Sequence, residues 1–506
     1  MFLELSKIGM PYVPGWEGLR PIAPELVIVA TILAMLVIPF FTNRPKAGCL
    51  LASVLGVGLA LLSAVVLGTG EGMLGSHFRG MIVVDAPAVV WKCLLLFFTL
   101  GVLVMWGSTT LRSMPQADVP EFLVLLLGAT LGMSLMAQTS NLLMIVMAIE
   151  LASFPSYVLA GFRKTRRRGA EAALKYVLFG ASASAVMIYG LSLLYGIGGT
   201  LQFEVIAAAL TRDGVGALGA VGLICLGVGI AFKISAVPVH LWCPDVFEGA
   251  SIEVSAFLSV ASKGAALLLM LRLITLLGDA AGFTGTTTTA AAVAIGVLGA
   301  ITCTVGNTAA YRQENIKRLL AYSSIAQAGY MLCLMAVVML SSAAAADATS
   351  ALLIYLSAYL FMNLGAFTVA GAVEANGEGS TLADLSGLGQ RAPVLAASMT
   401  ASLFSLIGLP PLAGFAAKIN LMRVVAEGGG WCWALVGVIG VNTVLSLYYY
   451  LRVIRVMYFE DAKGRGAVAN PVASALALAC AVLLLLMLVG FGVVQNVADS
   501  HATIHR

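Results

Sequence analysis

Four ionisable side chains lie inside long apolar runs of the sequence, where a charge is costly. They are Glu150, Lys233, Lys263 and Lys418. A charge at the centre of a membrane helix costs about 2.5–3.5 kcal/mol on insertion scales, so four of them cost on the order of 10 kcal/mol. That sum is comparable to the whole stability of a typical domain. The four side chains must therefore face an interior that is polar, hydrated or ion-paired.

Lysine and glutamate in such an interior can exchange protons. Burial disfavours the ammonium form of lysine and a neighbouring carboxylate favours it, so a lysine beside a glutamate can be charged or neutral near neutral pH. Arginine stays protonated and could not serve in this way. We expect Glu150 to pair with Lys233, and Lys233 to pass protons towards Lys263. Lys418 would be the corresponding relay group in the second half of the chain.

Long side chains near the end of a span can instead reach the lipid headgroups. This explanation fits four residues close to predicted span ends: Lys92, Lys175, Arg272 and Arg423. It stays open for Lys263. It does not fit Glu150, because its short side chain lies at the centre of an apolar run.

Other polar residues of the apolar runs give weaker signals. His240 lies two residues after Pro238, where it would either extend the relay towards the cytoplasm or cap a half-helix. Ser323, Ser324 and Gln327 could hold water, but polar packing between helices is the explanation we favour for them.

The whole composition is that of a membrane protein. Of 506 residues 60% are hydrophobic and 10% are charged, whereas an ordinary soluble domain is about 25% charged. A bilayer-spanning helix needs about 20 mainly apolar residues. The sequence holds about fourteen such segments, at 24–41, 48–69, 87–107, 119–137, 139–160, 171–196, 216–248, 254–278, 288–309, 316–341, 350–374, 391–427, 431–457 and 470–493. We predict an all-α integral membrane protein with about 14 transmembrane helices.

Two of these spans, 216–248 and 391–427, are too long for one straight crossing. Each has proline near its middle, Pro238 in the seventh span and Pro410 and Pro411 in the twelfth. Proline breaks a helix, and broken backbone at membrane depth persists only inside protein or beside a water-filled cavity. The two broken helices are five spans apart, so they cross the membrane in opposite directions. This arrangement predicts two inverted five-helix repeats with broken helices 7 and 12; two unrelated proline kinks are the alternative.

The repeats suggest a division of the chain. Residues 1–118 would hold helices 1–3, residues 119–280 the first repeat (helices 4–8), residues 281–460 the second repeat (helices 9–13), and residues 461–506 helix 14. Sixteen of the 28 Lys and Arg residues lie in loops after odd-numbered spans, against five in the other loops and tails. This bias places odd-span loops in the cytoplasm and both termini in the periplasm. The run GFRKTRRRG (161–169) is its strongest part, and an anionic-lipid or partner patch is the alternative explanation for that run.

Several chemistries find no support in the sequence. The eight Cys form no CxxC, there is no HExxH among the four His, and no GxGxxG after a strand or Walker A motif occurs. We therefore expect no metal and no redox cofactor on this chain. The net charge of +4 is too small to indicate binding to nucleic acid.

At the relay residues the chain resembles the antiporter-like membrane subunits of proton-pumping NADH–quinone oxidoreductase, respiratory complex I. The matching stretches are IELASFPSYVLAGF (149–162), EAALKYVLFGASASA (171–185), FKISAVPVHLWCPDVFEGA (232–250), FLSVASKGAALLLMLR (257–272), NIKRLLAYSSIAQAGYML (315–332) and GLPPLAGFAAKINL (408–421). The resemblance is closest to the N-type (ND2-like) subunits, because Lys418 stands where M-type subunits usually carry glutamate. The long lateral helix of L-type subunits is also not expected here.

The resemblance implies a place in a larger complex. The family's fifth-span glutamate falls on Glu150, and its lysines of spans seven, eight and twelve fall on Lys233, Lys263 and Lys418. This chain would move protons from cytoplasm to periplasm across a bacterial inner membrane, driven from the quinone site. NADH, FMN, iron–sulfur clusters and quinone would be bound by partner subunits. M-type and K-type subunits, the lateral helix of the L-type subunit and membrane lipid would be its neighbours.

One stretch departs from the family pattern. After WCPDVFEGA the family usually reads Pro-x-Pro, and here Ser251 and Glu253 occupy those positions. Cys243 is also less usual than a small polar residue. These changes question the rigidity of the loop before span eight.

Two other functions fit the same residues. A subunit of a multisubunit cation/proton antiporter would use the same lysines without electron transfer. A structural membrane subunit would need none of them for transport, so replacing Glu150 or Lys233 would leave pumping intact.

Overall fold

The computed structural model describes residues 15–41, 45–70, 73–111, 113–163, 166–212, 214–279, 286–341, 344–462 and 466–502. Long helices dominate these residues: α2 Ala23–Phe41, α3 Pro45–Thr69, α4 Ala86–Thr109, α5 Asp118–Met136, α6 Leu142–Ala160, α7 Arg167–Gly198, α9 Gly216–Ile234, α12 Lys263–Asp279, α13 Thr286–Ala310, α14 Ile316–Leu340, α15 Ala345–Ala375, α17 Pro393–Ile407, α18 Ala413–Glu427, α19 Cys432–Phe459 and α20 Pro471–Val489. Shorter helices are α1 Trp16–Leu19, η2 Arg20–Ile22, α8 Phe203–Arg212, α10 Trp242–Gly249, α11 Ile252–Phe257, η3 Leu258–Ser262, η5 Leu382–Leu385, α16 Leu388–Arg391 and α21 Phe491–Ser500.

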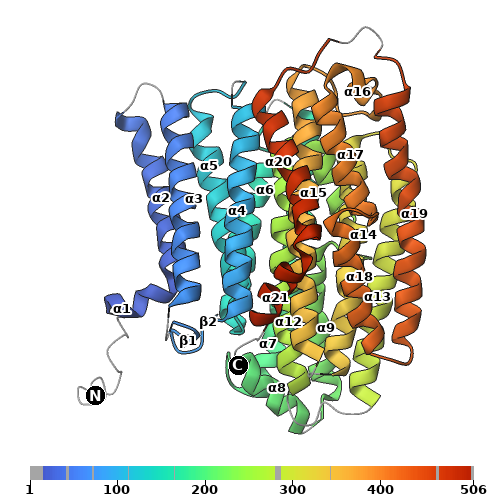
Figure 1. The fold of residues 1–506 in the computed structure, drawn as a ribbon. Coiled ribbons are helices and arrows are strands. Elements are labelled where there is room, and N and C mark those ends of the chain that lie inside the picture. Colours follow the sequence, from blue (N-terminus) through green and yellow to red (C-terminus); the bar gives the residue numbers. More distant parts are fainter. Residues whose placement is uncertain are drawn as a thin grey trace.

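A small hairpin is the one departure from the helical pattern in the part of the chain that the structure describes. Strands β1 Gly75–His77 and β2 Ile82–Val84 pair antiparallel, with Ser76 opposite Val83. The hairpin precedes α4 and covers one end of the helices (Figure 1).

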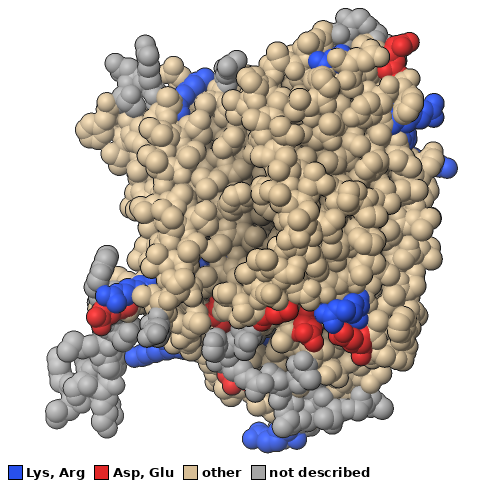
Figure 2. Space-filling model, in the orientation of Figure 1, with Lys and Arg blue, Asp and Glu red and all other residues tan. Residues whose placement is uncertain are grey.

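The predicted all-α membrane fold is confirmed. Thirteen helices of the described residues are long and apolar enough to cross a bilayer, and the remaining predicted crossing consists of the two 15-residue halves α17 and α18. The long helices run side by side, and α1 and α21 lie towards the same end of them (Figure 1). Lys, Arg, Asp and Glu on the visible face gather at the two ends and leave a wide uncharged belt between them (Figure 2). Such a belt is the surface that lipid tails require.

The crossings differ in how much of their surface is buried. The continuous crossing of α11, η3 and α12, together with α14 and α15, is buried on nearly every side. In contrast, about a third or fewer of the residues in the apolar stretches of α3, α7, α13, α19 and α20 are buried. The first group therefore forms the centre of the subunit, where a polar side chain is shielded from lipid.

Both long predicted spans are interrupted at their prolines. Helix α9 ends at Ile234, and α10 begins only at Trp242, with Pro238 between them. Helix α17 ends at Ile407, and α18 begins at Ala413, after Pro410 and Pro411. Each interruption leaves backbone carbonyls at a helix end inside the protein, where they can bind a cation.

The two halves of the chain repeat a hydrogen-bonding arrangement. Asn141 caps α6 and forms a bridge with Gln202, after α7. Asn315 caps α14 and forms a bridge with Thr381, after α15. These pairs lie at corresponding places in the proposed repeats and support them. The boundaries at residues 119, 281 and 461 stay predictions.

Two of the four residues assigned to snorkelling are buried ion pairs instead. Lys92 lies 2.9 Å from the Glu25 carboxylate, and Arg272 lies 2.8 Å from the Asp85 carboxylate. All four side chains are almost fully buried. The prediction was wrong because the partners come from distant segments of the chain, which hydropathy cannot reveal.

The other two residues assigned to snorkelling remain near the surface. Lys175 pairs with Glu171 and Asp245, and Arg423 pairs with Glu427, all with partly exposed side chains. Some cations used for the orientation lie outside the described residues: Lys7, Arg44, Arg112, Lys164, Lys463, Arg465 and Arg506.

Candidate functional site

The three predicted relay lysines lie inside the protein. Lys233 is 3% exposed, Lys263 is fully buried and Lys418 is 4% exposed. Lys233 is in the last turn of α9, Lys263 begins α12, and Lys418 lies in α18. Since none of them reaches the surface, headgroup contact does not explain Lys263. Burial of an ammonium group is tolerated only where acceptors or ring faces compensate it.

Glu150 is half-buried on α6 and does not contact Lys233 directly. Its carboxylate accepts a hydrogen bond from Ser184 Oγ of α7 at 2.5 Å. Among the described residues no ion pair within 4.0 Å joins it to Lys233, so the expected direct pair is absent. The two charges still interact electrostatically. Helix α7 packs against both α6 and α9, which explains why the groups are held apart.

Aromatic rings surround the ammonium group of Lys233. Its Nζ lies 5.6 Å from the ring centres of Tyr157 and Phe232, and 6.0 Å from that of Tyr176. Ring faces attract cations, most strongly where water is excluded. Such a site holds the ammonium without a fixed hydrogen bond to the described residues, so the ammonium group is not tied to one orientation.

Lys263 joins the two halves of the chain. Its Nζ donates a hydrogen bond to Ser324 Oγ of α14 at 2.6 Å and lies 3.9 Å from Cys243 Sγ. The preceding turn, Leu258–Ser262, is a π-helix. Single π-helical turns inside α-helices often occur at functional sites, because they change which residues face inwards.

Lys418 binds the broken end of α17. Its Nζ donates to the carbonyl oxygens of Ile407 at 2.9 Å and Leu406 at 3.3 Å, and lies 4.8 Å from the ring centre of Tyr330. The last carbonyls of a helix lack intrahelical partners and carry partial negative charge. The interruption at Pro410 therefore creates the acceptors that compensate this buried ammonium group.

Polar side chains of α14 connect Lys263 to Lys418. Ser324 binds Lys263, and one turn further Gln327 donates to the Leu406 carbonyl at 3.0 Å, which also accepts from Lys418. Tyr355 OH in turn donates to Gln327 Oε1, and Ser323 hydrogen-bonds Tyr450 OH. Tyr355 and Tyr450 were missed in the sequence. The polar positions 323, 324 and 327 were the available signal, and their contacts are the polar packing between helices that the sequence favoured.

His240 lies in the interruption between α9 and α10. It is 9% exposed, and its Nδ1 has no hydrogen-bond partner among the described residues. No side chain caps the first turn of α10, so His240 does not cap that half-helix. Its ring interacts electrostatically with Lys263. In the described part of the chain no three His, Cys, Asp or Glu side chains are grouped as metal ligands would be.

A row of buried polar groups between the two interrupted helices defines a class of protein. Ionisable residues inside a membrane domain mark pathways for ions or protons, and interrupted helices form the binding sites of many transporters. The fold and the site thus describe a membrane protein that moves a small cation.

Comparison with known proteins narrows this class. The family described as "NADH:quinone oxidoreductase/Mrp antiporter, TM" matches residues 139–446. NADH-quinone oxidoreductase subunit N of Anaeromyxobacter sp. (strain Fw109-5) is 38% identical over 459 residues, which cover 86% of this chain and 87% of that protein. A chain of respiratory complex I from Thermus thermophilus superposes with a TM-score of 0.75 at 32% identity, over 94% of this chain and 99% of that one. A chain of the Mrp complex from Dietzia sp. DQ12-45-1b shares the fold, with a TM-score of 0.80, 20% identity, and coverage of 96% and 97%. This chain belongs to the NADH:quinone oxidoreductase/Mrp antiporter family of membrane subunits.

Proposed function

We propose that this chain is the N-type membrane subunit of a proton-pumping NADH–quinone oxidoreductase. It moves protons from the cytoplasm to the periplasm, driven by quinone reduction in other subunits. The observation that carries the proposal is the row of buried polar groups on α14 between Lys263 and Lys418, which ends at the broken helix α17. The N-type relatives at similar length support the assignment to this subunit.

Each relay residue has a distinct role in this proposal. Glu150 and Lys233 interact through space, so a change in the charge of one alters the proton affinity of the other. Lys233 passes its proton towards Lys263 through water in the interruption at Pro238, beside His240. Lys263 and Lys418 exchange charge through hydroxyl groups and water along α14. The carbonyls at the end of α17 stabilise the proton while it resides on Lys418.

The surroundings of the subunit follow from the same assignment. We place it in a bacterial inner membrane, with loops after odd-numbered spans in the cytoplasm and both termini in the periplasm. NADH, FMN, iron–sulfur clusters and quinone would be bound by other subunits. The exposed apolar helices α3, α7, α13 and α19 would contact lipid or the neighbouring M-type and K-type subunits and the lateral helix of the L-type subunit.

The proposal is tested with Lys233→Met and Lys418→Met in inverted membrane vesicles that contain the assembled complex. Methionine keeps the length and removes the charge, so both variants are expected to lower NADH-driven acidification per NADH oxidised. Lys175→Met, at a partly exposed ion pair, is the matched control and should pump normally. Normal pumping by both buried-lysine variants would refute the relay. Cation-driven proton exchange without NADH would instead identify an antiporter subunit.

A further inference from the structure

A further buried acid lies apart from the relay residues and from the two buried ion pairs, on helix α11. Glu253 is fully buried, and neither of its carboxylate oxygens has a hydrogen-bond partner among the described residues. A buried carboxylate without partners costs several kcal/mol. A side chain this costly needs a reason other than packing.

Lys317 is a buried cation that interacts with this carboxyl group. It is 3% exposed, its Nζ donates to the Ala250 carbonyl at 2.9 Å, and it interacts electrostatically with Glu253 and Glu374. No ion pair within 4.0 Å joins Lys317 to Glu253 in the described structure. Glu253 therefore feels a positive charge but is not fixed by it, and it can bind or release a proton without breaking a hydrogen bond to a described group.

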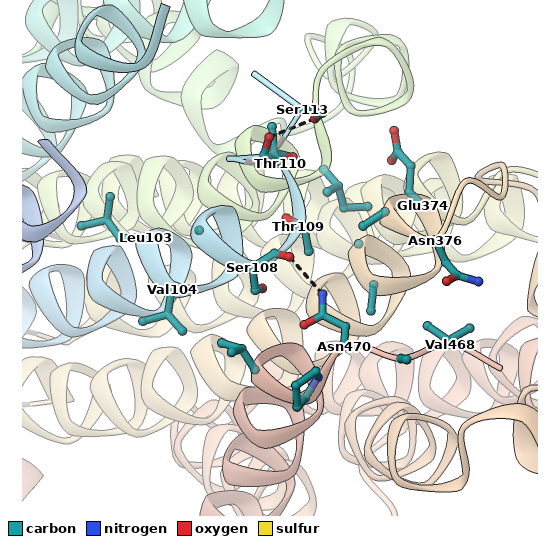
Figure 3. Close-up of a pocket in the computed structure, with 18 of the residues that line it drawn as sticks. Leu103, Val104, Ser108, Thr109, Thr110, Ser113, Glu374, Asn376, Val468 and Asn470 are labelled. Carbon is teal, nitrogen blue, oxygen red and sulfur yellow. Dashed lines mark hydrogen bonds between the residues drawn. The ribbon is translucent and has the colours of Figure 1, made fainter. Parts of the chain in front are cut away.

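A cavity of about 630 Å³ borders the start of α11, at the end of the helices that carries the Arg-rich loop. Its wall includes Arg163, Arg166, Glu374 and Ile252, the residue next to Glu253. Glu374 pairs with Arg166 at 3.0 Å, and its second oxygen has no hydrogen-bond partner among the described residues. Figure 3 shows Glu374 and Asn376 at the end of α15, across from Thr109, Thr110 and Ser113 at the end of α4. The charged wall makes this cavity a place where water can enter.

Further along α11–α12 and α14, both Glu253 and Lys317 are followed by residues that hold or form the Lys263 site. Lys317 and Ser324 are seven residues apart on α14, which places them on one face about 10 Å apart. Ser324 accepts the hydrogen bond of Lys263 Nζ. Glu253 and Lys263 belong to the same continuous crossing, ten residues or about 15 Å apart along the helix. A few water molecules would span that distance.

We propose that Glu253 is a proton-loading carboxyl group between this cavity and Lys263, with Lys317 as its counter-charge. A hydronium ion in the cavity gives up a proton and becomes water, and the proton passes through further water to a Glu253 carboxylate oxygen. The new O–H bond then breaks, and the proton passes through water to the neutral amine of Lys263, which becomes ammonium while the carboxylate is restored. Glu253 is thus a further proton carrier for the pumping reaction, and this inference rests on the proposed function.

The test uses the assembled complex in inverted vesicles with Glu253→Gln, Glu253→Asp and, as control, Glu427→Gln at a surface pair. Glutamine keeps the shape and cannot carry the proton, so acidification per NADH oxidised should fall about twofold or more, with recovery in Glu253→Asp and no change in the control. Infrared difference spectra between NADH-reduced and oxidised complex give the second measurement. The carbonyl band of a protonated, buried carboxyl group should be lost in Glu253→Gln and shifted in Glu253→Asp.

The outcomes separate this inference from the proposed function. If Lys233→Met and Lys418→Met abolish this subunit's pumping, while Glu253→Gln changes neither pumping nor the infrared band, only the role of Glu253 is refuted. If Glu253 only balances the charge of Lys317, Glu253→Gln should assemble poorly. The complex that does assemble should then show an unchanged infrared band. That result also refutes proton loading. If all buried-charge variants pump normally, the proposed function itself fails.

Discussion

Gly408 offers a specific test of how Lys418 is held. Its backbone has φ +88°, and a Cβ there would lie 3.3 Å from Lys418 Cδ and 3.5 Å from Nζ. Gly408→Ala introduces both a strained backbone and a side chain against the lysine stem. Left-handed backbone costs a residue with a Cβ about 1–2 kcal/mol. Loss of one hydrogen bond from a charged group costs about 1.5–3 kcal/mol more.

The backbone strain acts against the geometry in which the Lys418 ammonium binds the end of α17, whereas the hydrogen-bond energy opposes its displacement. The strain of about 1–2 kcal/mol shifts the population towards arrangements with Lys418 displaced by a factor of about 5–30, since every 1.4 kcal/mol is tenfold. We therefore expect Gly408→Ala to lower NADH-driven acidification per NADH oxidised in vesicles with fully assembled complex.

Two further variants identify the cause of the pumping defect expected for Gly408→Ala. Gly437→Ala on α19 is the control, because a Cβ at that position meets no atom within 4 Å. Gly408→Asn separates the two contributions, since asparagine tolerates left-handed backbone better but still carries a Cβ. If Gly408→Asn recovers pumping, backbone strain is the cause; if it stays defective, contact with Lys418 is. Wild-type pumping by Gly408→Ala would refute the reasoning that Lys418 must bind the α17 carbonyls.

Two other predictions concern buried polar contacts. Gln327→Leu removes the group that hydrogen-bonds both the Leu406 carbonyl and Tyr355 OH, at a cost of about 1–3 kcal/mol for each group left unpaired. We expect lower acidification per NADH oxidised and a lower temperature of thermal inactivation. Unchanged acidification per NADH oxidised would contradict a role of α14 in the relay. Arg272→Leu leaves the Asp85 charge uncompensated, which costs about 3–5 kcal/mol, whereas the double replacement with Asp85→Asn removes both charges. The single variant should reduce the amount of assembled subunit and the double variant should recover part of it, as measured by quantifying the complex in membranes; equal amounts would show that the pair is dispensable.

Much of the fold could be predicted because its causes are local. An apolar run of about 20 residues must form a membrane helix whatever surrounds it, and a proline interrupts that helix wherever it occurs. The broken crossings at Pro238 and Pro410, and the burial of Lys233, follow from such short stretches of sequence. The cost of a charge in hydrocarbon likewise depends only on its place in the run.

The partners of the buried groups depended on the tertiary structure. Lys263 meets Ser324 across 61 positions and Arg272 meets Asp85 across 187, and nothing in either local stretch indicates these contacts. Whether Glu150 touches Lys233 or Ser184 is decided by how α6, α7 and α9 are rotated when they pack. The sequence by itself determined that this protein spans the membrane with charges in its interior. Only the packed helices decided which acceptors hold those charges, because a hydrogen bond requires two atoms within about 3 Å and helix rotation sets that distance.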